Sequence, residues 1–176
     1  LIGLIALLIV IAILVGRQLL KVRHDEISLI RLDKENIDNS NDVSKMYELA
    51  SVQIKKRLYP QAISTLKKAL SLLENEPAEA KAVIENAMGF ALAAQDDFKA
   101  AINHYKSALK AKSEYPVAIN NLAFAKQRLN EYEDALDLYN KVLKIDPSNK
   151  TAKKQAEKIK TRNLAKLTNN SNSRGF

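Results

Sequence analysis

Cysteine and tryptophan are absent from this chain, and histidine, glycine and proline are scarce. Without cysteine the protein has neither a disulfide framework nor a thiolate metal site. The two histidines, His24 and His104, lie too far apart in sequence to suggest a local metal pair. No nucleophile–base pair and no glycine-rich phosphate loop is apparent, so we expect no enzyme, no metal and no cofactor. Scarce glycine and proline beside abundant alanine, leucine and lysine predict long helices.

Positive charge is concentrated at the C-terminal end of the chain. The formal net charge is +8, yet residues 1–149 contain 20 Lys/Arg against 19 Asp/Glu. Residues 150–176 contain 8 basic side chains and a single acidic one, Glu157. This basic segment is either a solvated capping face or a surface that meets an anionic membrane or an acidic partner. Nucleic acid is not expected as a partner, because no aromatic residue lies among the lysines before Phe176.

The N-terminal residues are almost purely apolar. Leu1 to Gly16 reads LIGLIALLIVIAILVG, with no charged or polar side chain. Continued to residue 20, the run has the length of a membrane-spanning helix, so we predict a transmembrane anchor over 1–20 and a juxtamembrane segment and polar linker over 21–42. Arg17 and Lys21 follow the run, which favours the repeats staying on the side of synthesis. The alternatives are a cleaved signal peptide, which lacks its preceding basic charge here, and a buried core helix.

The sequence repeats itself with an offset of 34 residues. ENAMGFALAAQDDFKAAINHYKSALK aligns with INNLAFAKQRLNEYEDALDLYNKVLK, and YELASVQIKKRLYPQAISTLKKAL is an earlier copy at an offset of 39. Each copy has a small residue midway along its first predicted helix, an aromatic residue opening the second, and an alanine soon after that lets the two backbones approach. In chain order these are Ala50, Gly89 and Ala123; Tyr59, Phe98 and Tyr132; and Ala62, Ala101 and Ala135.

A 34-residue period with this pattern resembles the tetratricopeptide repeat. The resemblance implies an all-α solenoid of three helix-turn-helix repeats plus a C-terminal capping helix, here behind one N-terminal transmembrane helix. We place the repeats within residues 43–147, at about 43–76, 82–115 and 116–149, the capping helix at 149–166 and a disordered tail at 167–176. Asp42 is the expected N-cap of the first repeat helix.

In tetratricopeptide proteins the first helix of each pair lines a concave face where protein partners bind. Asn86 and Asn120 are repeat equivalents on that face, as are Phe90 and Phe124. An asparagine pair suits the backbone of an extended peptide, and the phenylalanines offer apolar contact, with Gln127 and Arg128 at the edge. The alternative is that the asparagines are solvated and the phenylalanines pack inside. The Lys/Asn/Arg set that clamps chaperone C-termini in some family members is not present in register.

The whole arrangement resembles the tetratricopeptide photosystem I assembly factors of cyanobacteria and algal plastids. The resemblance rests on KKRLYPQAISTLKKAL in the first repeat, NNLAFA in the third, and VLKIDPSNKTAKK leading into the basic end. It implies a single-pass thylakoid protein, with repeats in the stroma or cytosol, that helps to assemble photosystem I by binding its polypeptides and has no small-molecule substrate. The alternatives are an anchored receptor or scaffold for protein import, secretion or envelope assembly, and a tether that only self-associates.

Overall fold

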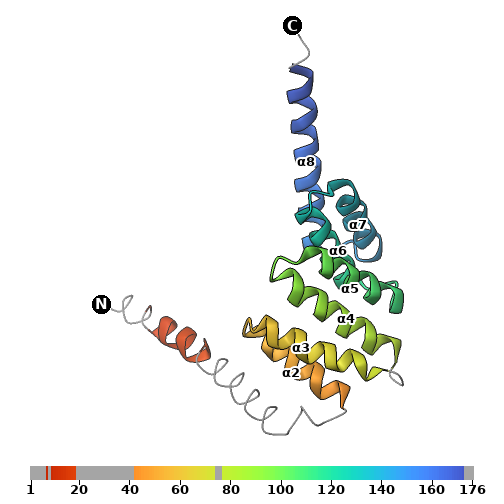
Figure 1. Cartoon of the computed structure of the whole chain (residues 1–176). Helices are drawn as coiled ribbons and strands as arrows, with labels where there is room; N and C mark the ends of the chain where they lie inside the picture. The colour runs from red at the N-terminus through yellow and green to blue at the C-terminus, as the bar shows by residue number, and fades with distance from the viewer. Residues whose placement is uncertain (1–6, 8, 19–41, 74–76, 173–176) are drawn as a thin grey trace.

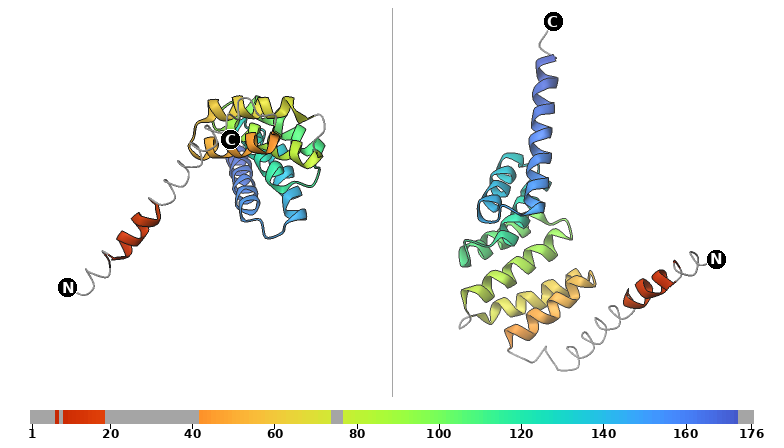
Figure 2. Two further views of the ribbon diagram at one scale, coloured as in Figure 1. Left: turned by 90° about the horizontal axis from the view of Figure 1, so that it is seen from below. Right: turned by 180° about the vertical axis from the view of Figure 1, so that it is seen from behind.

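Three helix pairs in succession, followed by one long helix, make up residues 43–172. The structure is a computed structural model, and it describes residue 7 and residues 9–18, 42–73 and 77–172. The first pair is α2 (Val43–Lys55) and α3 (Tyr59–Ser71), the second is α4 (Ala78–Ala93) and α5 (Phe98–Ala111), and the third is α6 (Pro116–Arg128) and α7 (Tyr132–Ile145). The helix α8 (Lys150–Asn172) follows and extends beyond the stack (Figures 1 and 2).

The predicted solenoid is confirmed, and its helix starts follow from local sequence. Tyr59, Phe98 and Tyr132 each open the second helix of a pair, as the repeat register predicts. The Asp42 carboxylate accepts a hydrogen bond of 3.2 Å from the Lys45 backbone N–H, so Asp42 is the N-cap of α2. The second pair begins at residue 78, directly after Pro77, which is four residues earlier than predicted. The helix α8 continues to residue 172, beyond the predicted end at 166, because no proline or glycine interrupts it.

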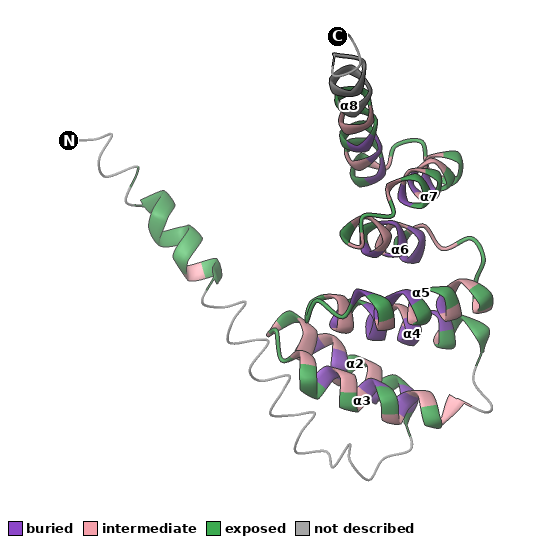
Figure 3. Cartoon of the chain, turned by 45° about the horizontal axis from the view of Figure 1, so that its top comes forward, coloured by how far each residue is buried: buried purple, intermediate pink, exposed green. Residues whose placement is uncertain are grey.

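Alanine makes the close packing within the pairs possible. Ala62, Ala101 and Ala135, the predicted contact residues, are fully buried. Each helix contacts the next along the chain, so the apolar core is continuous from α2 to α8. Figure 3 shows this core on the facing sides of the helices, with exposed residues outside. No helix pair buries its apolar face alone, so the stack is the stable unit.

The predicted transmembrane helix requires a correction. Within the described ranges, no helix combines the length and the apolar character needed to cross a bilayer. Residues 9–18 are helical, and their side chains are mostly exposed. Residues 1–6, 8, 19 and 20 of the predicted segment, and residues 21–41 of the predicted linker, lie outside the described residues.

The turn between the two helices of each pair has the same geometry in all three repeats. Arg57, Asp96 and Asn130 occupy equivalent positions and have φ of 60°, 63° and 65°. In the first turn the Leu58 N–H donates to the Gln53 carbonyl and the Arg57 N–H to the Ile54 carbonyl, and the other two turns repeat this pattern. These paired bonds form the Schellman motif, in which a left-handed residue ends the helix.

We expect Arg57→Gly to stabilise the protein, because arginine, unlike asparagine or aspartate, has no side chain suited to the left-handed region. Relief of that strain is partly offset by the greater conformational freedom of glycine in the unfolded chain. The free energy of unfolding should therefore rise by about 0.5–1 kcal/mol. Urea denaturation monitored by circular dichroism measures the change. Arg57→Ala is the control, since it removes the same side chain but keeps Cβ. Equal stability of the two variants would contradict the assignment.

Candidate partner-binding face

The first helices of successive pairs form the inner side of the stack. Helix α2 contacts α4, and α4 contacts α6, more extensively than the second helices contact one another. The predicted binding residues lie on α4 and α6, two of these first helices. We call this surface, which comprises the outward-facing side chains of α2, α4 and α6, the concave face.

Phe90 and Phe124 stand exposed on the concave face. Their exposed fractions are 44% and 40%, which is high for phenylalanine in a folded domain. The Phe124 ring meets Phe98 edge to face, with ring centroids 6.3 Å apart, and the Arg128 guanidinium lies 5.8 Å from its centroid. Phe124 is thus held in place by neighbours while part of its ring stays available to a partner.

The asparagines join one repeat to the next. Asn86 accepts a hydrogen bond of 3.0 Å from the Asn121 amide, so its partner is the neighbour of the expected equivalent, Asn120. Asn120 donates to Asn149 at 3.2 Å, while its own Oδ1 is buried and has no hydrogen-bond partner in the described part of the chain. The amides are therefore ordered and partly buried rather than solvated. Their role in binding a peptide remains a prediction.

Sequence reasoning missed Asn149, although a helix-capping sequence surrounds it. Its Oδ1 accepts a bond of 3.0 Å from the Ala152 N–H, which caps α8, and the same oxygen accepts from Asn120. Hydrogen bonds from Ser148 and then from Asn149 hold the pKa of the Asp146 carboxyl below its usual value. The run Asp146–Asn149 before a helix is a recognisable capping sequence, and it fixes Asn149 beside α6.

The edge residues of the predicted site have distinct partners. Gln127 accepts a bond of 3.2 Å from the Tyr139 hydroxyl and donates to Gln155 at 3.4 Å, which links α6 to α7 and α8. Burial raises the pKa of Tyr139 to about 12, so the phenol is neutral and able to donate at physiological pH. Arg128 pairs with Asp96 across the preceding turn at 3.2 Å.

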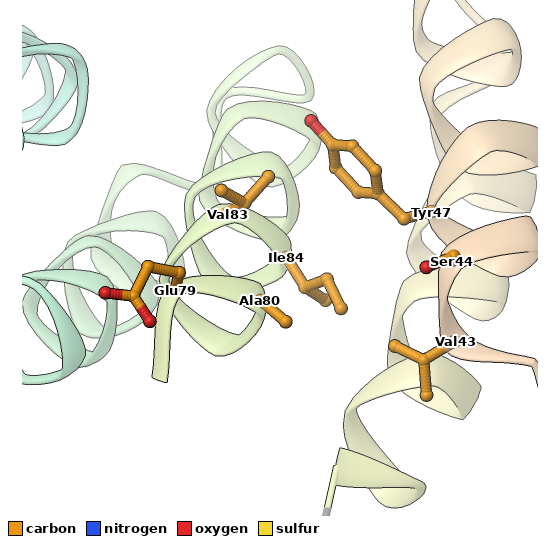
Figure 4. A pocket seen from close by; sticks show the side chains of 7 residues that line it. All are labelled: Val43, Ser44, Tyr47, Glu79, Ala80, Val83 and Ile84. Atoms are coloured by element: carbon orange, nitrogen blue, oxygen red, sulfur yellow. The ribbon is translucent and has the colours of Figure 1, made fainter. Parts of the chain in front are cut away.

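An apolar pocket lies at the N-terminal end of the concave face. Its volume is about 260 Å³, and α2 and α4 supply its walls (Figure 4). In Figure 4 the Tyr47 side chain extends from α2 toward Val83 of α4. The lining residues are Val43, Ser44, Tyr47, Glu79, Ala80, Val83 and Ile84.

Tyr115, at the start of α6, lies near Tyr47. Burial of the Tyr115 phenol, and next the nearby Tyr47 phenol, raise the pKa of Tyr115.

Glu85 is the one buried charged residue among those described, and its partner lies on the other helix of the same pair. Its Oε2 is 2.6 Å from His104 Nδ1, and the Glu85 side chain is 11% exposed. The contact joins α4 to α5. In the described ranges, no group of three or more His, Cys, Asp or Glu side chains is arranged to hold a metal ion. His104 therefore serves as a hydrogen-bond partner of a buried carboxylate.

We expect His104→Leu to lower the free energy of unfolding by about 1–3 kcal/mol, because it leaves the buried Glu85 carboxylate without its hydrogen bond. His104→Gln retains a donor and should cost less. Chemical denaturation of both variants measures the difference. If His104→Leu were as stable as the unaltered protein, the contact would contribute nothing.

Comparison with known proteins agrees with this geometry. Family models described as tetratricopeptide repeat match residues 42–114 and 92–157. The ycf37 protein of Cyanophora paradoxa is 32% identical over 141 residues, which cover 79% of this chain and 80% of that protein. The chain belongs to the ycf37 family. The resemblance drawn from its repeat motifs, to the tetratricopeptide photosystem I assembly factors, is thereby confirmed.

More distant similarity extends this picture. The chloroplastic tetratricopeptide repeat domain-containing protein PYG7 of Arabidopsis thaliana is 28% identical over 83% of this chain and 48% of that protein. Among solved structures, the Cut9–Hcn1 assembly matches 82% of this chain and 28% of its own, at 18% identity and a TM-score of 0.73. The second tetratricopeptide domain of human RPAP3, solved with an HSP70 peptide, matches 65% of this chain and 92% of its own, at 20% identity and a TM-score of 0.60. These structures establish the fold.

Proposed function

We propose that this ycf37-family protein acts in a plastid or cyanobacterium as a docking factor for the assembly or stability of photosystem I. Its concave face binds segments of photosystem I polypeptides that are exposed on the stromal side, and it releases them once the complex is complete. The lysine-, asparagine- and isoleucine-rich composition suits an AT-rich plastid genome.

The repeated exposed phenylalanines carry this proposal. Phe90 and Phe124 offer two apolar anchors at the spacing of one repeat. They lie on the same face as the asparagine side-chain amides and the apolar pocket between α2 and α4. Aromatic anchors of this kind dominate the energetics of protein interfaces. An extended polypeptide laid along the face would contact both rings, and its apolar side chains would enter the pocket.

Deletion of the gene tests the proposal. We expect photosystem I to decline while photosystem II is unchanged, as measured by immunoblot and by the photo-oxidisable reaction-centre signal of each complex. Equal loss of both photosystems, or accumulation of unimported precursors with intact photosystem I, would contradict it. The second of these outcomes would favour an import receptor.

Complementation shows whether the concave face carries the activity. The double variant Phe90→Ser/Phe124→Ser should bind photosystem I polypeptides about tenfold more weakly or worse and restore little photosystem I. The matched control is Leu58→Ser/Ile145→Ser, which removes two exposed apolar side chains of similar exposure (36% and 38%) outside the concave face. Thermal unfolding of both proteins verifies that each is folded. Full restoration by the phenylalanine variant would exclude the proposed face.

A further inference from the structure

Among the described residues, two arginines one repeat apart each lie over the aromatic ring that opens a second helix. Arg128 at the end of α6 lies over Phe98, with Cζ 4.6 Å from the ring centroid. Thirty-four residues later, Arg162 of α8 lies over Tyr132 at 3.4 Å. Both rings open the second helix of a pair. The repeat register therefore continues into the capping helix and places a guanidinium at the same point.

The two stacks differ in what faces the guanidinium. In the first, Asp96 in the left-handed turn accepts a hydrogen bond from Arg128 at 3.2 Å. The equivalent turn residue of the next repeat is Asn130, whose Oδ1 accepts instead from the Tyr132 hydroxyl at 2.7 Å. The second arginine therefore has no carboxylate where the first has one.

Arg162 is left incompletely satisfied by the described residues. Its Nη1 is buried and has no hydrogen-bond partner among them. A buried donor on a charged group is costly to leave without an acceptor. Glu157, the one acidic residue of the C-terminal segment, pairs with Lys160 at 3.1 Å and so does not supply that acceptor.

A pocket of about 360 Å³ opens at this arginine, between the end of α6, the start of α7 and the middle of α8. None of the residues that line it is acidic, and three are cationic. Such a pocket attracts an anion, and the planar guanidinium groups suit a carboxylate. Two of its residues, Gln127 and Arg128, also form the edge of the concave face. The lining residues are Gln127, Arg128, Asn130, Tyr132, Lys158, Ile159 and Arg162.

We infer that this pocket binds an acidic side chain of the docked protein partner. The partner's carboxylate takes, beside Arg162, the place that Asp96 takes beside Arg128. The inference rests on the proposed function, because it adds a second contact to the same docked partner. Apolar side chains of the partner contact Phe90 and Phe124, and an Asp or Glu of the partner enters the pocket beside α8. A client segment is thus apolar with an acidic residue at one end.

Titration of the full chain with a fluorescein-labelled hexaglutamate peptide tests the inference, with hexaglutamine as the uncharged control. We expect saturable binding of hexaglutamate, accompanied by a shift of the Arg162 Nε–H resonance in nitrogen-edited NMR spectra. Arg162→Gln should weaken binding about tenfold or more, because charge-assisted hydrogen bonds are lost. Lys153→Gln removes one charge from an exposed position of α8 outside the pocket, so it should change binding only slightly.

Asn130→Asp supplies a sharper test, because it restores in the chain itself the carboxylate of the preceding repeat. This variant should close the pocket to hexaglutamate about as effectively as Arg162→Gln, without removing any cation. Asp96→Asn should do the opposite and strengthen binding by freeing Arg128. Circular dichroism verifies that all variants remain folded.

Several results would overturn the inference. These are no binding by the unaltered protein, an equal loss for Lys153→Gln and Arg162→Gln, or no effect of Asn130→Asp. Inorganic phosphate competing more strongly than hexaglutamate would assign the pocket to phosphate instead of carboxylate. If the protein binds hexaglutamate as expected but deletion of its gene does not reduce photosystem I, the carboxylate-binding pocket is supported and only the proposed function is contradicted.

Discussion

Tyr105→Ala is expected to lower the free energy of unfolding by about 3–5 kcal/mol, because it leaves a ring-sized cavity in the centre of the stack. Tyr105 of α5 is 2% exposed and packs against α4 and α6. Burial raises the pKa of its phenol above the usual value, which is consistent with a neutral, desolvated ring. Equilibrium urea denaturation, followed by circular dichroism at the helical band, measures the loss.

The matching control is Tyr105→Phe, which keeps the ring. This variant should remain within about 1 kcal/mol of the unaltered protein, because volume-conserving core changes are tolerated best. A small effect of Tyr105→Ala, comparable to that of Tyr105→Phe, would mean that the central repeat does not depend on this ring. It would then contradict the continuous core from α2 to α8.

Gly89→Ala should also destabilise the protein, by about 1–2 kcal/mol, although alanine is the better helix former. A Cβ atom at Gly89 would lie 2.6 Å from Cε1 and 2.8 Å from Cδ1 of Tyr105. Because that ring is buried, it cannot swing aside, so α4 and α5 would have to move apart. Thermal unfolding of the variant measures the effect, and a gain in stability would contradict this close approach.

A double-mutant cycle isolates the contact. The first repeat has Ala50 and Leu66 at the positions of Gly89 and Tyr105, and both of those residues are fully buried. Gly89→Ala combined with Tyr105→Leu recreates that pair in the second repeat. We therefore expect the double variant to lose less stability than the two single changes predict together, with a coupling of about 0.5–3 kcal/mol. Strict additivity would mean that the two residues do not compete for space.

The helix pairs were predictable from sequence because their signals are local. Each second helix begins with an aromatic residue and has an alanine one turn later, where it packs against the first helix. These signals lie within a few turns of helix, and the repeat offset shows that they recur. The predicted transmembrane helix was wrong: the N-terminal run has the apolar composition of a span, yet within the described residues no helix is both long and apolar enough to cross a bilayer.

The hydrogen-bond partners on the concave face were not predictable in the same way. Asn86 and Asn120 are repeat equivalents, but the Asn86 side chain accepts its hydrogen bond from Asn121. The rotation between adjacent repeats decides which side chains face each other. Arg162 was missed because the predicted repeats end at residue 147, before α8. Extending the offset of 34 from Arg128 into α8 would have located it.

Site-specific photo-crosslinking tests the central claim most directly, namely that the concave face docks photosystem I polypeptides. Benzoylphenylalanine in place of Phe90 or Phe124 preserves an aromatic ring at an exposed position, and the same probe in place of the exposed Leu58 reports on a surface outside that face. In plastids or cells assembling photosystem I, the account predicts crosslinks to photosystem I polypeptides from positions 90 and 124 and none from position 58. Crosslinks from position 58 alone, or from positions 90 and 124 only to proteins outside photosystem I, would contradict it.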